Sequence, residues 1–497
     1  MKRYVAGEPY SARRVTAFQR RIERLARRVH MVDLLAEGPD AFIGFQDDLA
    51  RLQAEIQRDI GELKKTVRKD KKAIPALDWL RRLRWYSRCL GDALAWEVLL
   101  FDRKTIAALM TGTRQPIAAI TTSHQAVVSM AGYLLSQQFG VPIIHDITNW
   151  LRIGDITFMQ PKKEGKSWGF QTVELKSSVN DSETLDDGVI QANVTVNVYS
   201  NEPMDLLKGL ENTPKAEAAA STTPENLGAT VPAKQDRRLK KQFQRLDKMI
   251  AQRDMKDNAI TTVDGIPNVV FRLPHEDTHH WADLRRAIRN ARRDGCAFFS
   301  IDHFIGYTIF YRKEGVTEEH ISKFREPMVE HVQNDLLAHG GGGFLLVREL
   351  PMAEEYDVEG FPFMRFFSYK IPQNAIADLL RNRLLMVATV NYGLLDAALA
   401  ERGFNVTGMN GEPRDDAYPY SCKVAWPTGE TFRLGMPSSQ VSREVERALY
   451  EFSGLDDVVQ KVASVQLLPD LISYADFEAS LEAQAAHGEA VQQNKPV

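Results

Sequence analysis

Hydrophobic residues recur every three or four positions through most of the first hundred residues. This spacing places one apolar face on each of three predicted helices, over residues 11–35, 40–69 and 77–110. Gly38 and Pro39 stand between the first two and are typical of a turn, so we expect an antiparallel helical hairpin. Packing, or association with a second copy or another protein, would account for such helices as well as any chemistry.

The period changes at about residue 117. One further helix is expected over residues 123–138, ending before Gly140. Apolar runs of strand length then follow over residues 141–147, 153–159 and 169–175. The pattern therefore predicts a helix followed by three strands.

The second half of the chain is introduced by a segment without any apolar period. Residues 205–235 are rich in Ala, Thr, Pro and Glu, which predicts a flexible insertion. The elements expected next are a basic helix, a strand, a helix and two strands, over residues 236–256, 268–273, 279–293, 296–301 and 305–312. The remainder alternates strands such as 344–350 with long helices such as 374–402.

Together these elements predict a mixed α/β protein in three parts. An N-terminal helical domain would cover residues 1–112. A central domain would cover residues 113–315 and contain the insertion, and an α/β region would cover residues 316–497.

Composition limits the class of protein without identifying it. The 497 residues are 44% hydrophobic and 26% charged, which is typical of a globular protein. No apolar stretch has the length of a membrane span, and no apolar segment of a signal peptide follows Met1. The three cysteines are too far apart in sequence for a disulfide framework. We therefore expect a cytoplasmic protein without a membrane partner.

Charge is unevenly distributed although the formal net charge is only -3. Residues 1–90 contain roughly 21 Lys and Arg against 12 Asp and Glu, an excess of about nine positive charges. Such an excess can provide a basic face for a polyanion, and solvated helix faces are the alternative explanation.

The strongest chemical signal lies in two of the predicted strands. Asp155 lies in the first, and Glu174 and Lys176 lie two residues apart in the second. Positions i and i+2 share one face of a strand, so the carboxylate and the amine would project together. A hairpin would bring Asp155 beside Glu174, and two close carboxylates suit Mg²⁺ or Mn²⁺, with the carbonyl of Leu175 as a further ligand.

This arrangement resembles the PD-(D/E)XK nuclease superfamily, which has a restriction-endonuclease-like αβββαβ core and a motif of Asp, spacer and Glu-x-Lys. The resemblance covers residues 117–275. It implies a metal-dependent nuclease in which Asp155 and Glu174 bind the metal and Lys176 is the catalytic lysine. DNA is favoured over RNA as the substrate, and by analogy such an enzyme would suit restriction or anti-phage defence in a bacterium.

Two positions depart from the superfamily pattern. The proline that often precedes the Asp is replaced by Gly154. A helical Glu often precedes the first strand, and here the candidates for that helix partner are Gln125 and Glu97. Outside the resemblance, Asp155 could be a turn residue and Glu174 and Lys176 an exposed pair.

The basic helix at 236–256 falls where the superfamily places the helix after its third strand. We expect it to bind the nucleic-acid backbone, with a solvated surface helix as the alternative. The residues assigned to this contact are Arg237, Arg238, Lys240, Lys241, Gln242 and Arg245.

Two other functions compete with the nuclease. One is a catalytically silent nucleic-acid-binding or scaffold protein with the same fold. The other is a zinc metalloprotease, because His275-Glu276-Asp277-Thr278-His279 matches H-E-x-x-H. That chemistry requires both histidines one turn apart on a helix, whereas Pro274 and a predicted strand come directly before them.

Overall fold

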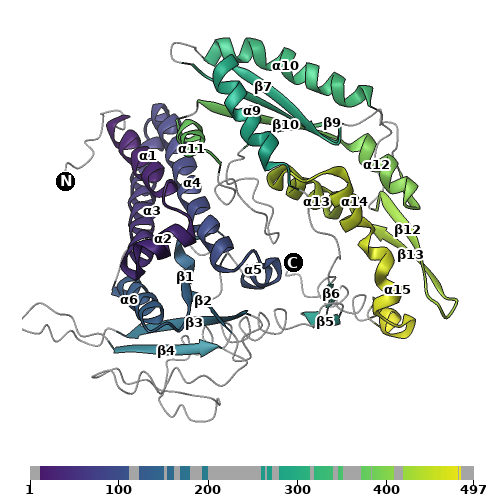
Figure 1. The fold of residues 1–497 in the computed structure, drawn as a ribbon, viewed down its shortest axis with the longest axis horizontal. Coiled ribbons are helices and arrows are strands. Elements are labelled where there is room, and N and C mark those ends of the chain that lie inside the picture. The colour runs from purple at the N-terminus through teal and green to yellow at the C-terminus, as the bar shows by residue number, and fades with distance from the viewer. Residues whose placement is uncertain are drawn as a thin grey trace, which may run out of the picture. The chain divides into compact units, whose positions relative to one another are not determined.

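The fold is given by a computed structural model (Figure 1). It describes residues 12–110, 122–149, 151, 154–161, 168–178, 193–199, 259–263, 266–270, 279–313, 318–339, 345–350, 371–381, 383–407, 418–479 and 481–482. The predicted insertion at 205–235 and the basic helix at 236–256 lie outside these residues.

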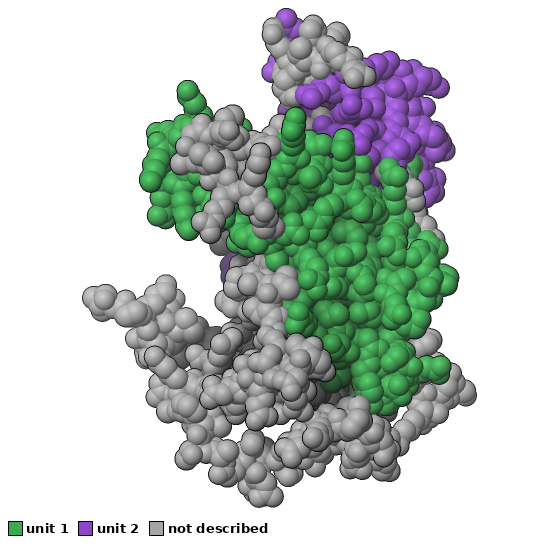
Figure 2. Space-filling view, turned by 90° about the vertical axis from the view of Figure 1, so that its left-hand side faces the viewer, with its two compact units in different colours: residues 1–253, 364–373 green, residues 254–363, 374–497 purple. Residues whose placement is uncertain are grey.

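The chain forms two compact units, coloured separately in Figure 2. Unit 1 comprises residues 1–253 and 364–373, and unit 2 comprises residues 254–363 and 374–497. Both contain helices and antiparallel sheet, so the mixed α/β class expected from the sequence is confirmed. Among the described helices, none is both long and apolar enough to cross a membrane.

The described part of unit 1 begins with a group of helices. Their bounds are α1 Ala12–Ala26, α2 Met31–Glu37, α3 Pro39–Val67, α4 Ile74–Val98, α5 Arg103–Leu109 and α6 Thr122–Ser136, with short 3-10 turns at Lys71–Ala73 and His145–Ile147. The apolar stripe predicted for residues 40–69 is buried along α3, from Phe45 to Leu63. The spacing therefore identified the core face correctly.

Two of the predicted helices are interrupted. The expected helix at 11–35 is divided between α1 and α2, and the one at 77–110 between α4 and α5. At the second interruption, Leu100 and Phe101 adopt positive φ angles of 51° and 59°, which a continuous helix does not allow. The apolar period continues through both interruptions, so period alone could not locate them.

The sheet of unit 1 is a four-stranded antiparallel meander in the order β1-β2-β3-β4. Its strands are β1 Val141–Ile144, β2 Ile156–Pro161, β3 Trp168–Ser178 and β4 Asn193–Tyr199. The first three were predicted. The fourth was missed, although Val194, Val196 and Val198 alternate with polar residues as in a half-buried strand.

Helix α3 covers the free edge of this sheet. The side-chain amide of Gln46 donates to the Pro142 carbonyl (3.2 Å) and accepts from the Ile144 N–H (2.9 Å). Gln53, two turns later, donates to the carbonyl of Ile147 (2.9 Å). The outer backbone N–H and C=O groups of an edge strand have no neighbouring strand to bond. Here side-chain amides of α3 supply their hydrogen-bond partners. The N-terminal helices and the sheet thus form one unit, across the domain boundary predicted near residue 112.

Unit 2 contains the remaining described elements. The helices are α9 Trp281–Asp294, α10 Glu318–Ala338, α11 Gln373–Leu380, α12 Tyr392–Glu401, α13 Ser438–Glu451, α14 Leu455–Ala463 and α15 Leu468–Leu471, with a 3-10 turn at Ser464–Leu467. The strands are β5 Ala259–Val263, β6 Ile266–Val270, β7 Cys296–Ile301, β8 Ile305–Tyr311, β9 Leu345–Leu350, β10 Leu384–Asn391, β11 Phe404–Val406, β12 Tyr420–Ala425 and β13 Thr431–Met436.

The main sheet of unit 2 has the order β7-β8-β10-β9 and is antiparallel throughout. Strands from residues 296–311 and from residues 345–391 thus belong to one sheet. The domain boundary predicted near residue 315 would divide this sheet between two domains. The strand predicted at 268–273 is β6, which pairs with β5 in a separate two-stranded sheet. The fourth strand of the unit 1 sheet is therefore β4, and β6 does not join that sheet.

The prediction of one long helix over residues 374–402 is wrong. The region contains α11, then β10, then α12. Strand β10 is the apolar run Leu384-Leu385-Met386-Val387-Ala388, and it lies between β8 and β9 with nearly every side chain buried. A strand covered on both faces does not alternate, so its pattern cannot be distinguished from that of a buried helix.

Candidate active site

Asp155 lies directly before β2, where its backbone bond to β3 departs from the register of the β2–β3 pairing. Ile156 is the register partner of Val173, and the N–H of Asp155 also donates to the Val173 carbonyl (2.9 Å). Two residues on one strand thus lie against one residue on the other, which is the arrangement of a β-bulge. Bulges redirect side chains and are common beside active sites. The Asp155 N–H is consequently bonded to the residue that directly precedes Glu174 on β3.

Glu174 and Lys176 belong to the part of β3 that continues beyond the start of β2. Their backbones pair with Asn197 and Thr195 of β4, while the pairing with β2 ends at Val173. Their side chains lie outside the described part of the structure. Alternate carbonyls of a strand point the same way, so the Leu175 carbonyl points toward the Asp155 side, as the Val173 carbonyl does.

Gly154 explains why no proline precedes Asp155. Its φ is +76°, whereas proline fixes φ near -65°. A Cβ at this position would lie 2.5 Å from Cγ2 of Thr172 and 3.1 Å from the Val173 oxygen. Only glycine satisfies both conditions, so the departure from the superfamily pattern has a local structural cause.

A chain of buried hydrogen bonds supports the same end of β2. His145 donates its backbone N–H to the Asp155 carbonyl (2.9 Å), and its Nδ1 lies 3.1 Å from the Gly154 carbonyl. A carbonyl can only accept, so Nδ1 carries a proton, and Nε2 is hydrogen-bonded to the Thr157 hydroxyl (2.9 Å). Thr157 is in turn bonded to the Thr172 hydroxyl (2.9 Å). His145 was not identified from the sequence, where its only signal is its place after an apolar strand.

The loop between β1 and β2 is held by α4. Asp92 accepts from both the backbone N–H (2.6 Å) and the side-chain amide (2.7 Å) of Asn149, and all these groups are buried. Arg88 donates to the Asp146 carbonyl (3.2 Å). Hydrogen bonds to charged groups are the stronger ones, so the loop that leads to Asp155 is fixed from the helical side.

Two carboxyl groups near this loop have shifted pKa values in opposite directions. Burial raises the pKa of Asp146, although the charges of His124 and Arg88 oppose the shift. Burial also acts to raise the pKa of Asp47, but hydrogen bonds and charge from Arg51 and His124 hold it below its ordinary value. His124 Nε2 lies 3.0 Å from Asp47. The two acids thus differ because Asp47 has direct ionic partners.

The two candidates for the helical partner occupy different environments. Gln125 is exposed on α6. Glu97, near the end of α4, has one oxygen 2.9 Å from Nδ1 of His30, and the other accepts the backbone N–H of Met31 (2.6 Å). Glu97 therefore binds the first N–H of α2, which gives it a structural role in the helical group.

Comparison of the chain with protein-family models, curated proteins and solved structures gave no match.

The remaining predicted sites are the nucleic-acid-binding residues and the H-E-x-x-H match. The six assigned to nucleic-acid binding, Arg237, Arg238, Lys240, Lys241, Gln242 and Arg245, lie outside the described residues. His279, the second histidine of the H-E-x-x-H match, forms an isolated bridge with Ser453, and α9 begins only at Trp281. It is therefore not in a helix interior, where a zinc metalloprotease would need it.

Proposed function

We propose that this protein is a metal-dependent nuclease that hydrolyses phosphodiester bonds, with Asp155, Glu174 and Lys176 as its active centre. The observation that carries the proposal is the bulged pairing of β2 with β3, in which the Asp155 N–H bonds to the residue before Glu174. Lys176 follows two positions later along β3, on the same face by alternation. The proposed restriction-endonuclease-like core would comprise α6 and β1 to β3.

The donor groups fit a hard divalent cation. Carboxylates and backbone carbonyls are the ligands that Mg²⁺ and Mn²⁺ prefer. Asp155 and Glu174 would supply the carboxylates, and the Leu175 carbonyl would be a further ligand. A bound Mg²⁺ or Mn²⁺ would neutralise phosphate charge and lower the pKa of a bound water.

Residues of the chain would orient the attacking water, stabilise the developing charge and bind the nucleic acid. The Lys176 amine would orient the attacking water and stabilise the negative charge that develops on the phosphate oxygens. The hydrogen bonds from His145 to Gly154 and Asp155 would hold the bulge in position. The basic helix at 236–256 would bind the backbone of the nucleic acid, with DNA the expected substrate.

A cleavage assay tests the proposal. The purified full chain is incubated with plasmid, single-stranded DNA and RNA in Mg²⁺, in Mn²⁺ and in EDTA. We expect metal-dependent cleavage that EDTA abolishes and that Glu174→Gln removes, whereas Asp78→Asn, an exposed carboxylate on α4, should cleave as wild type does. Binding without cleavage under all conditions would instead support the silent nucleic-acid-binding protein.

A further inference from the structure

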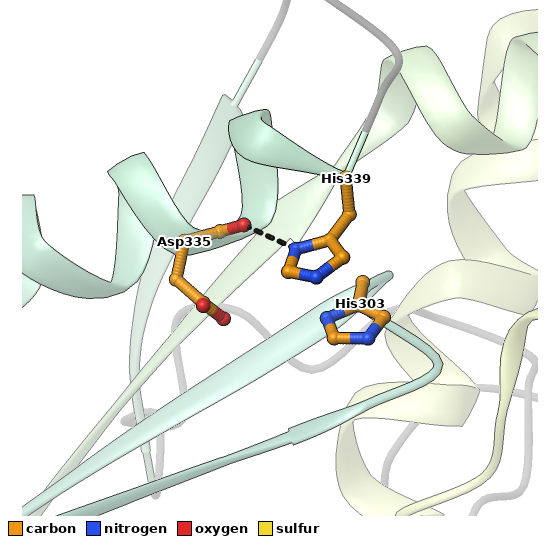
Figure 3. A group of neighbouring side chains, drawn as sticks. All are labelled: His303, Asp335 and His339. Atoms are coloured by element: carbon orange, nitrogen blue, oxygen red, sulfur yellow. Dashed lines mark hydrogen bonds between the residues drawn. The ribbon is translucent and has the colours of Figure 1, made fainter.

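A second cluster of ligating side chains lies in unit 2, unconnected with the proposed nuclease centre. His303 comes from the turn between β7 and β8, and Asp335 and His339 come from the end of α10 (Figure 3). One potential ligand atom of each lies within 4.8 Å of the others. Among the side chains that the structure describes, these are the only three His, Cys, Asp or Glu residues grouped in this way.

We propose that His303, Asp335 and His339 bind one transition-metal dication of the Zn²⁺ class. Two imidazoles and a carboxylate are ligands that Zn²⁺ takes in tetrahedral sites with three protein ligands and one open position. Ligands on one tetrahedral Zn²⁺ lie about 3.4 Å apart, given bonds of about 2.1 Å. The cluster therefore has to contract by little more than about 1 Å.

The proton positions suit this role. His339 Nδ1 lies 2.7 Å from the carbonyl of Asp335, which can only accept, so Nδ1 carries the proton. The lone pair of the neutral ring is consequently on Nε2, the other nitrogen. Metal-binding histidines almost always donate their second N–H to a carbonyl or carboxylate in this way.

The two histidine rings already lie face to face. Their centroids are 3.5 Å apart with an angle of 8° between the planes. In stacked rings the in-plane lone pairs of the nitrogens are parallel, so the two rings have to tilt before both can bind one ion. Both side chains are exposed and Asp335 is half-buried, so they can close on an ion without displacing the core.

The backbone around the cluster is held rigidly. Asp302 and His303 both have φ of 51°, which is uncommon for residues other than glycine, and the Asp302 carboxylate accepts the N–H of Leu455 (3.0 Å). Positive φ at two successive residues is what a tight hairpin turn requires, and the Phe304 N–H closes this turn by donating to the Ile301 carbonyl (2.9 Å).

Asn391 connects the turn with α10. Its backbone N–H donates to the Phe304 carbonyl (2.8 Å), and its side-chain amide donates to the Leu336 carbonyl (3.1 Å). Helix α10 also lies very close to β8, because a Cβ on Gly306 would be 2.4 Å from Val332. These contacts fix the spacing between His303 and His339, and a preorganised ligand set is what a metal site requires.

Metal titration tests the site. The full chain, without a histidine tag and stripped with EDTA, is titrated with Zn²⁺ by calorimetry and with Co²⁺ by visible absorption. We expect one ion at this cluster, in addition to any ion held at the proposed nuclease centre, and a Co²⁺ spectrum typical of tetrahedral coordination. His303→Ala, Asp335→Asn and His339→Ala should each raise the Kd by at least about ten-fold. Binding should weaken as the pH falls, because protons and the metal compete for the same imidazole nitrogens.

His331→Ala is the matched control, because His331 also lies on α10 but packs edge-on against Phe298. It should bind Zn²⁺ at this cluster as wild type does. Circular dichroism verifies that each variant is folded. The metal site is refuted if wild type binds no Zn²⁺ stoichiometrically, or if folded variants of all three ligands retain wild-type affinity. A loss in His331→Ala equal to that in His339→Ala would also contradict it.

Discussion

Single residues around Asp155 carry most of the structural support for the active centre. Gly154 has a positive φ and no room for a side chain, and His145 bonds to the two residues at the bulge. Neither requirement can be read from the sequence, where Gly154 is only a departure from an expected proline. The sequence supplies candidate residues for the proposed chemistry, since side-chain type is visible there, but it does not show the bulge.

Gly154→Ala should destabilise unit 1. The substitution forces a left-handed conformation on a residue with a Cβ and pushes that Cβ against Thr172. We expect the free energy of unfolding to fall by about 1–3 kcal/mol, the range for one strained backbone position. Urea denaturation measures the change, with Gly44→Ala on α3, where a Cβ meets nothing within 4 Å, as the control. Equal effects in the two variants would contradict the strained geometry.

Asp146→Asn should stabilise the protein at neutral pH. Burial raises the folded-state pKa of this carboxyl above its ordinary value of 3.8, so the folded chain holds the proton more tightly than the unfolded chain. Stability is therefore lost as the pH rises through this interval. The variant cannot ionise, so its melting temperature should exceed that of wild type at pH 7, by a margin that shrinks toward pH 4. A lower melting temperature at pH 7 would mean that the charged form is the one stabilised by Arg88 and His124.

At the scale of elements, helical period identified the buried stripe of α3, and short apolar runs bounded by turn residues identified β1 to β3. An apolar run that is buried on both faces has no period, so only its length and flanking residues distinguish a strand from a helix. Strand β10 is such a run, and the predicted helix 374–402 merged it with the helices on either side, which is wrong. Strand β4 had a clear alternation that was overlooked.

The contact between α3 and the edge of β1 yields a prediction for Gln46. Gln46→Leu keeps the volume but leaves the Pro142 carbonyl and the Ile144 N–H without their partners in a buried place. We expect a loss of about 1–3 kcal/mol for each such group. Gln440→Ala on α13 is exposed and should change stability by less than about 0.5 kcal/mol. Hydrogen exchange of the Ile144 amide should also accelerate in Gln46→Leu, and unchanged exchange would show that α3 does not seal the sheet.

At the scale of the whole molecule, the two units carry two proposed sites of different chemistry. The proposed centre in unit 1 consists of carboxylates and a lysine, which suit a hard ion, whereas the cluster in unit 2 is rich in imidazole. The unit boundaries could not be read from the sequence, because they depend on pairings such as that of β8 with β10 between segments distant in the chain. Composition and period describe local neighbours only.

The most direct measurement of the central claim compares cleavage with binding in two variants. Asp155→Ala removes a proposed metal ligand, so both metal affinity and cleavage should fall. Lys176→Ala leaves the ligands intact, so it should bind nucleic acid and metal as wild type does, while single-turnover cleavage falls about 100-fold or more. Lys64→Ala, an exposed lysine at the end of α3, controls for the loss of one positive charge. Wild-type cleavage rates in both active-centre variants, or no metal-dependent cleavage by the wild-type chain, would contradict the assignment of Asp155, Glu174 and Lys176.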